Sequence, residues 1–268
     1  VDALVITTSK ELLYPYISAV EKCGIEVLDI TINAFACAKE AFDAAYLQEG
    51  AVLIDIGYKT STISFYKDGY LQYLTVCQVG GYDFTRNVAQ NMQISMNQAE
   101  TYKIKYGSLD VTKGQNDIIH TTVIDGKKHD YTQQDLADIL KESAYNVIGK
   151  IKEKIAVIDS AGKYETLIVG GGGELEMIDT IASEVLECPV RVYRPQTIGA
   201  RDMSLVGTIG MIYYLMERNK IVGNYTPSLV LPDISNTMSV RFKGLTKTSP
   251  KNQNGKMSKL IDSFFSED

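Results

Sequence analysis

A run of apolar and β-branched residues ends in an aspartate and a glycine, and a second β-rich run follows almost at once. The whole stretch is 52–66, VLIDIGYKTSTISFY, with Asp55 and Gly57 at the junction. A strand with so few polar residues is typical of the interior of a sheet, where both faces are covered. The stretch therefore predicts a hairpin whose first strand is buried on both faces, and it places the Asp55 carboxylate at a tight turn.

The residues at this turn have the chemistry of a cation and phosphate site. A carboxylate here can hold a divalent cation, directly or through water. Gly57 lets the backbone approach a phosphate, and Thr60 and Ser61 supply hydroxyl and N–H donors. The same short pattern also occurs where an ordinary strand ends in a turn, so its interpretation depends on the glycine run downstream.

That glycine run comes directly after another short apolar segment. Residues 166–169 predict a buried strand, Gly170 to Gly173 follow it, and 174–187 has a helical pattern. Glycines have no β-carbon, so their backbone amides stay open to an anion or to the flat edge of a ligand. A flexible loop is the alternative, but four glycines between a strand and a helix favour a turn that contacts a nucleotide.

The composition excludes several other kinds of site. The four cysteines are far apart and show no paired spacing, which argues against a disulfide or zinc framework and favours a reduced, cytosolic protein. The chain has two histidines, which leaves little room for imidazole catalysis or a histidine-rich metal site. No apolar run is long enough to cross a bilayer. We also expect no nucleic-acid partner.

Periodicity and turn signals predict the remaining elements. A capping-box pattern, Thr132 with Asp135, predicts the start of a long helix with an apolar stripe. The dipeptide Asp125-Gly126 predicts the turn of a second hairpin within 117–131. The other predicted strands are 3–6, 25–32, 70–79 and 190–193, and the other predicted helices are 9–23, 34–47, 84–94, 98–107 and 202–219.

The C-terminal part of the chain has a different composition. Residues 221–255 lack periodicity and predict a linker, and the segment 241–259 has six Lys or Arg and no carboxylate. Residues 256–266 then carry a one-sided apolar stripe, which predicts an amphipathic helix on a membrane surface. Docking on the protein's own body or on a partner groove is the alternative. The stripe consists of Met257, Leu260, Ile261, Phe264 and Phe265.

The order of these motifs resembles the actin-like ATPase superfamily and, within it, the FtsA family of bacterial cell division proteins. Asp55-x-Gly57-x-x-Thr60 is similar to the second phosphate motif of the superfamily, and Gly80-Gly81 is similar to the turn that follows it. The stretch 99–107 resembles the FtsA-type segment that meets the nucleoside. Residues 169–172 resemble the adenosine motif.

The resemblance implies an α/β fold of the actin-like (ribonuclease H-like) type, consisting mainly of domain 2. Residues 1–48 would be a remnant of domain 1, covering the end of subdomain 1C and the last part of 1A. Residues 49–220 would be domain 2, namely 2A with the 2B insertion at about 108–158. The first phosphate loop would lie upstream of Val1.

The same resemblance implies ATP and Mg²⁺ as cofactors, with weak ATP hydrolysis at most. Asp55 would organise the Mg²⁺ ion, directly or through water. Glu100 and Lys103 would meet the nucleoside, although their spacing is also that of an ordinary exposed ion pair on a helix. The expected nucleotide-binding residues are Gly57, Thr60, Ser61, Gly80, Gly81, Glu100, Lys103, Gly170, Gly171, Gly172 and Leu175.

The implied function is a cell division protein on the cytoplasmic face of the cell membrane at the division site. Such a protein polymerises as an actin-like filament, anchors the FtsZ ring and recruits later division proteins. It would bind the C-terminal peptide of FtsZ through 2B, and the anionic membrane surface through its tail. Two alternatives remain: a pilus assembly platform that resembles PilM, and a small-molecule kinase of the same superfamily.

Overall fold

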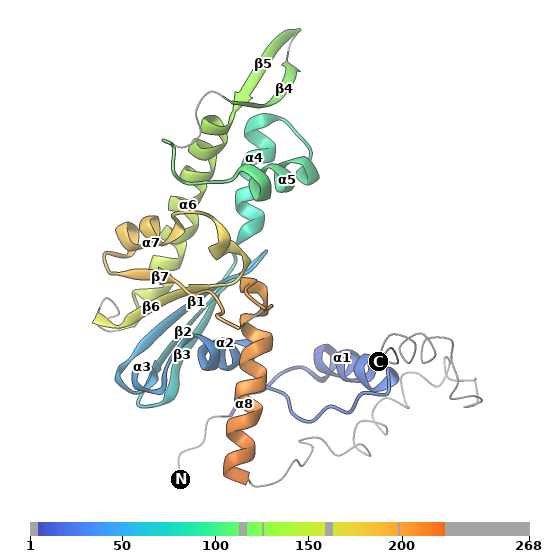
Figure 1. Cartoon of the computed structure of the whole chain (residues 1–268), viewed down its shortest axis with the longest axis vertical. Helices are drawn as coiled ribbons and strands as arrows, with labels where there is room; N and C mark the ends of the chain where they lie inside the picture. The colour runs from blue at the N-terminus through green and yellow to red at the C-terminus, as the bar shows by residue number, and fades with distance from the viewer. Residues whose placement is uncertain (1–4, 113–116, 125, 159–162, 198, 223–268) are drawn as a thin grey trace, which may run out of the picture. The chain divides into compact units, whose positions relative to one another are not determined.

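The computed structural model describes residues 5–112, 117–124, 126–158, 163–197 and 199–222 (Figure 1). The chain divides into two compact units, and the larger one spans Thr31–Gly223. The smaller one contains, among the residues that the structure describes, 5–30. All of the sheet and both of the pockets discussed below belong to the larger unit.

The smaller unit contains one described helix, α1 (Lys10–Lys22). Its N-terminus is capped by Ser9, whose side chain accepts from the backbone N–H of Glu11, and Gly24 beyond its end has φ of +77°. This confirms the predicted helix and both of its end signals. The predicted strand 25–32 is wrong, and the described part of 3–6 forms no strand. A β-like sequence becomes a strand only where a neighbouring strand pairs with it.

The larger unit is built on a five-stranded sheet with the order β3-β2-β1-β6-β7 (Figure 1). The central strand β1 (Ala51–Ile56) is antiparallel to β2 (Ser61–Lys67) and parallel to β6 (Glu165–Val169). The outer strands are β3 (Tyr70–Cys77) and β7 (Val190–Val192). The predicted hairpin and its central first strand are therefore confirmed.

Helices cover both faces of the sheet (Figure 1). Val52, Ile54 and Ile56 of β1 point to one face, where they join a core cluster with residues of α4, α6 and α7. The alternate residues Ala51 and Leu53 point to the other face and pack with α2, α3 and α8. The helices are α2 (Asn33–Ala41), α3 (Ala44–Glu49), α4 (Gly81–Met92), α5 (Met96–Tyr106), α6 (Gln133–Ile155), α7 (Ile178–Leu186) and α8 (Val206–Val222).

The second hairpin forms a separate two-stranded sheet, β4 (Ile118–Ile124) and β5 (Lys127–Thr132), as predicted. Thr132 caps α6 by accepting from the backbone N–H of Asp135, and the Asp135 carboxylate accepts from the backbone N–H of Thr132. The capping box is therefore confirmed, and α6 directs its apolar stripe into the larger core cluster.

The predicted single helix 34–47 is wrong because two helices, α2 and α3, occupy this region. Phe42 between them is extended, with φ −122° and ψ 139°, and its ring is buried in the cluster that includes Leu47. The gain from burying this ring favours a break in the helix. The small side chains of α2 still allow the close packing that they predicted, because Ala36 and Ala38 are buried and α2 lies against α8.

Two further predictions concern residues that lie partly or wholly outside the described part of the chain. The linker 221–255 begins inside α8, which extends to Val222, and its residues from 223 on lie outside the described part. The amphipathic helix 256–266 lies entirely outside it. Among the helices that the structure describes, none has both the length and the apolarity to span a membrane. The domain boundaries stay predictions.

The crossing of α2 and α8 depends on a glycine. A β-carbon on Gly210 would lie 1.8 Å from the carbonyl oxygen of Ala36, so Gly210→Ala forces the two helices apart. We expect it to lower the free energy of unfolding by about 1–3 kcal/mol. The control Gly149→Ala on α6 meets no atom within 4 Å, and it should raise that free energy by about 0.5–1 kcal/mol. Urea denaturation followed by circular dichroism measures both, and equal stability of the two variants would contradict the described packing.

Candidate functional site

The turn between β1 and β2 is attached to the N-terminus of α4 by backbone hydrogen bonds. The N–H of Gly57 donates to the carbonyl of Thr60 at 3.0 Å, and the N–H of Gly81 donates to the carbonyl of Gly57 at 2.9 Å. A β-carbon on Gly80 would lie 2.5 Å from the same Gly57 carbonyl oxygen. Glycine is required at position 80 by this close approach, which holds the turn against the helix.

Lys103 on α5 connects that helix to the start of α4. Its Nζ donates to the carbonyl of Gly81 at 3.1 Å, to Oγ1 of Thr85 at 2.9 Å and to Oε2 of Glu100 at 2.8 Å. The hydroxyl of Thr85 also contacts the Glu100 carboxylate. The Lys103 side chain is 11% exposed, so the pair with Glu100 is not an ordinary surface ion pair. All three ammonium protons have acceptors within the protein, and the group compensates the negative charge of Glu100.

The glycine run forms a 3₁₀ turn, Gly171–Glu174, that packs on the end of β1. Gly170 has φ of +85°, and a β-carbon there would lie 2.3 Å from Oδ1 of Asp55. A β-carbon on Gly172 would lie 2.2 Å from Cγ2 of Ile56, whereas one on Gly171 would meet no atom within 4 Å. Gly170 and Gly172 are therefore required by packing, and Gly171 faces open space.

The helix predicted to begin at residue 174 begins four residues later, because α7 starts at Ile178. The intervening segment pairs with the chain after α5. The N–H of Leu109 donates to the carbonyl of Glu176 at 3.2 Å, and Oγ of Ser108 donates to Oε2 of Glu176 at 2.9 Å. This pairing holds residue 176 outside a helix, so the glycine run does not form the N-terminus of an α-helix.

The β1–β2 turn, α5 and the glycine turn enclose a pocket of about 360 Å³. This volume is in the range of small-molecule sites in proteins. Both of its carboxylates have cationic partners, since Glu100 pairs with Lys103, and Glu174 pairs with Nη1 of Arg194 at 2.5 Å. The lining residues are Gly57, Tyr58, Gly81, Glu100, Lys103, Ile104, Gly107, Gly171, Gly172, Glu174 and Leu175.

Most of the predicted nucleotide-binding residues meet in this pocket, and four do not line it. Gly80 and Gly170 lie behind the lining, where they allow the turns to pack. Thr60 closes the β1–β2 turn through its carbonyl. Ser61 is buried and its hydroxyl donates to the carbonyl of Val79 at 2.8 Å, which corrects the prediction that this hydroxyl is free to donate to a phosphate.

The pocket also contains residues that were not among the predicted binding residues, namely Tyr58, Ile104, Gly107 and Glu174. Ile104 is 74% exposed, and an isolated apolar residue beside Lys103 carries no periodic signal. Glu174 directly follows the glycine run, so this position could have been used to predict that it belongs to the pocket. Its ion pair with Arg194 depends on a residue twenty positions away and was not predictable from the local pattern.

Asp55 lies outside this lining, at the end of β1. Its Oδ2 accepts from Nδ2 of Asn33 on α2 at 2.8 Å. Burial raises the pKa of the Asp55 carboxyl, and the hydrogen bond from Asn33 partly opposes this. Within the described ranges, no group of three or more His, Cys, Asp or Glu side chains could hold a metal ion. A single carboxylate fits Mg²⁺ only where water and ligand phosphates complete the coordination.

Comparison with known proteins identifies the family. The family model for "Cell division protein FtsA" matches residues 52–210, which include every residue of the pocket. The cell division protein FtsA of Bacillus subtilis is 27% identical over 288 residues, covering 99% of this chain and 65% of that protein. The FtsA of Staphylococcus epidermidis is 26% identical over 217 residues, covering 79% of this chain. The chain spans 65% and 46% of the lengths of these two relatives.

Solved structures show the same fold. MreB5 of Spiroplasma citri bound to ADP has a TM-score of 0.64 at 18% identity, covering 81% of this chain and 68% of that one. The PilM–PilN type IV pilus biogenesis complex has a TM-score of 0.58 at 14% identity, covering 77% of this chain and 58% of that one. These identities establish the fold alone, and the predicted actin-like α/β fold is confirmed.

The raised pKa of Asp55 leads to a prediction about stability and pH. Below its ordinary pKa of 3.8 the carboxyl is protonated in both the folded and the unfolded chain, so folding buries a neutral group and no charge. As the pH rises through the interval between the ordinary and the raised pKa, the carboxyl ionises in the unfolded chain but stays protonated in the folded chain, so the folded state loses stability. Asp55→Asn should therefore raise the midpoint of thermal unfolding at pH 7.5.

That gain should shrink as the pH falls towards 4. Asparagine keeps an oxygen that accepts from Asn33, so the packing is preserved. Asp138→Asn, the same change at an exposed position of α6, controls for the loss of one negative charge. Thermal melts of the three proteins at both pH values measure the effect, and a lower midpoint for Asp55→Asn at pH 7.5 would contradict the described surroundings of Asp55.

Proposed function

This chain belongs to the FtsA family of cell division proteins, and from that premise we propose that its pocket binds ATP. The observation that carries the proposal is the convergence of Lys103, Glu100 and the glycine turn on one pocket of small-molecule size. These residues come from segments that are far apart in the sequence. Both carboxylates of the lining are already paired with cations, so the lining does not repel an anionic ligand.

In the proposed complex the pocket walls have distinct roles. Gly171 and Gly172 present backbone without side chains, so the flat face or edge of the base can approach them, and Leu175 covers it. Glu100 accepts from sugar hydroxyl groups. The β1–β2 turn at Gly57 lies towards the phosphates. Asp55 would hold Mg²⁺ through water, and the ion would neutralise phosphate charge. Hydrolysis is proposed to be weak at most.

The wider proposal follows the family. The protein would polymerise as an actin-like filament on the cytoplasmic face of the membrane at the division site, anchor the FtsZ ring and recruit later division proteins. Subdomain 2B, at about 108–158, would bind the C-terminal peptide of FtsZ, and it includes the β4–β5 hairpin. The family match favours this function over a pilus platform or a small-molecule kinase.

ATP binding can be tested with two lysines of the same helix. Lys103 lines the pocket, whereas Lys105 is fully exposed and its ammonium group lies over the ring of Tyr106. Lys103→Met should weaken ATP binding roughly tenfold or more, because it leaves the carboxylate of Glu100 without its cation and an unpaired carboxylate in the lining repels an anionic ligand. Lys105→Met should change it less than twofold. Saturation-transfer NMR with Mg-ATP measures affinities even in the millimolar range.

A third variant separates ligand binding from folding. Gly171→Leu directs a side chain into open space, so it should leave the thermal midpoint unchanged and abolish the ATP signal. Equal losses for Lys103→Met and Lys105→Met, or undiminished binding by Gly171→Leu, would show that ATP does not occupy this pocket.

The proposed membrane helix 256–266 can be tested by charge placed on either side of it. Phe264 belongs to the apolar stripe, and Ser266 falls on the opposite side of a helical projection. Phe264→Glu should strongly reduce co-sedimentation of the chain with anionic vesicles, because it removes an apolar side chain worth about 1.5–3 kcal/mol on full burial and adds repulsion. Ser266→Glu adds the same charge and should have a much smaller effect. Failure of the unmodified chain to sediment at low salt, or equal sedimentation of both variants, would exclude a membrane anchor.

A further inference from the structure

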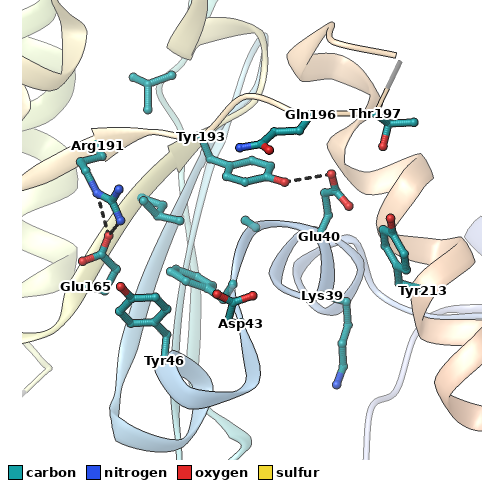
Figure 2. A pocket seen from close by; sticks show the side chains of 14 residues that line it. Lys39, Glu40, Asp43, Tyr46, Glu165, Arg191, Tyr193, Gln196, Thr197 and Tyr213 are labelled. Carbon is teal, nitrogen blue, oxygen red and sulfur yellow. Dashed lines mark hydrogen bonds and ion pairs between the residues drawn. The ribbon is translucent and has the colours of Figure 1, made fainter. Parts of the chain in front are cut away.

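A second and larger pocket, of about 840 Å³, lies on the α2 side of the sheet (Figure 2). Its walls come from the end of α2, the start of α3, the strands β6 and β7, the segment after β7, and α8. It shares no lining residue with the pocket proposed to bind ATP. Its function is therefore a separate question, and the inference below goes beyond the proposed function.

Three tyrosines from different elements contribute to its walls. Tyr46 belongs to α3, Tyr193 follows β7 and Tyr213 belongs to α8, as Figure 2 shows. Tyr46 is 39% exposed and Tyr213 is 45% exposed, so their rings remain open to a ligand. Aromatic faces attract cations, and a planar guanidinium group can also stack on them.

The cationic side chains of the pocket are already neutralised. Arg191 pairs with the carboxylate of Glu165, as the dashed lines in Figure 2 indicate. The ammonium group of Lys39 lies 2.5 Å from Oε2 of Glu217. Neither cation is therefore available to attract an anionic ligand.

Two carboxylates remain without a cation among the residues that the structure describes. Oε1 of Glu40 accepts from the hydroxyl of Tyr193 at 2.9 Å, and that donor is neutral. Asp43, three positions further on, has no cationic side chain within ion-pair distance in the described chain. Both line the pocket and are labelled in Figure 2. Glu40 is half-buried and Asp43 is exposed. Two neighbouring carboxylates without a counter-charge favour the binding of a cation.

The surroundings of Tyr193 agree with a negative potential in the pocket. Burial raises the pKa of its hydroxyl, and the hydrogen bond to Glu40 and the negative charges of Glu40 and Asp43 raise it further. The hydroxyl therefore stays protonated and continues to donate to Glu40. This donor orients the Glu40 carboxylate within the pocket.

We propose that this pocket binds an arginine side chain presented by a peptide segment of a protein partner. The guanidinium group would pair with Glu40 and Asp43, and its plane would stack on the tyrosines. Arginine fits better than lysine because its planar fork of donors matches carboxylate oxygens and its face stacks on aromatic rings. The pocket is larger than one side chain requires, so neighbouring residues of the peptide also enter it.

The test uses fluorescence anisotropy with the full 268-residue chain. The probe is a labelled octapeptide in which arginine alternates with serine, and the comparison peptides replace arginine by lysine, by the uncharged citrulline or by glutamate. Measurements at 0.15 M salt suppress diffuse attraction between the peptide and a chain of net charge −6. We expect the arginine peptide to bind, the lysine peptide to bind several-fold more weakly, and the other two not to bind.

Variants locate the binding site. Glu40→Gln with Asp43→Asn should weaken binding of the arginine peptide at least tenfold, and glutamine still accepts from Tyr193. The control pair Glu142→Gln with Glu153→Gln removes the same two charges from exposed positions of α6 and should change binding less than twofold. Tyr213→Ala, at an exposed position of α8, should weaken binding without any change in charge.

The proposal fails under any of four results. These are absence of binding by the arginine peptide, equal binding by the citrulline peptide, preferred binding of the glutamate peptide, and equal losses in the two double variants. Thermal melts of every variant verify folding. If the Glu40 and Asp43 double variant does not fold, Tyr213→Ala decides the question, and unchanged binding by that variant then refutes the stacking site.

Discussion

The carboxyl end of β1 is approached by backbone from two directions, more closely than any side chain would allow. On one side Gly80 lies against the carbonyl of Gly57, and on the other Gly170 and Gly172 lie against Asp55 and Ile56. This crowding brings the start of α4 and the glycine turn to the same strand end. The pocket exists because both of them are held there, and α5 then closes its third side through Lys103.

The glycines therefore have two different roles that look identical in the sequence. Gly170 and Gly172 are required for packing, and a β-carbon on either would meet atoms of β1. Gly171 between them meets nothing and is open to a ligand. A glycine run that resembles a phosphate or nucleoside motif thus contains mostly structural glycines, and its role in binding depends on one exposed backbone segment.

The two pockets differ in how their charges are balanced. In the pocket proposed for ATP, the carboxylates of Glu100 and Glu174 have cationic partners, so an anion can enter. In the larger pocket the cations are paired and the carboxylates of Glu40 and Asp43 are left without one in the described chain. The lining residues of each pocket are mixed in charge, and only the pairing determines which sign of ligand each one favours.

The sequence alone determined the features that depend on neighbouring residues. The apolar run before Asp55 predicted a central strand, Thr132 with Asp135 predicted the cap of α6, and ordered motifs predicted most residues of the smaller pocket. Tertiary structure decided the features that depend on distant partners. Pairing with residues 108 and 109 delays the start of α7, the burial of Phe42 separates α2 from α3, and the carbonyl of Val79 engages the Ser61 hydroxyl. The larger pocket joins α2, β6, β7 and α8, which no local pattern connects, because its charges and rings meet only when the sheet and its helices have packed.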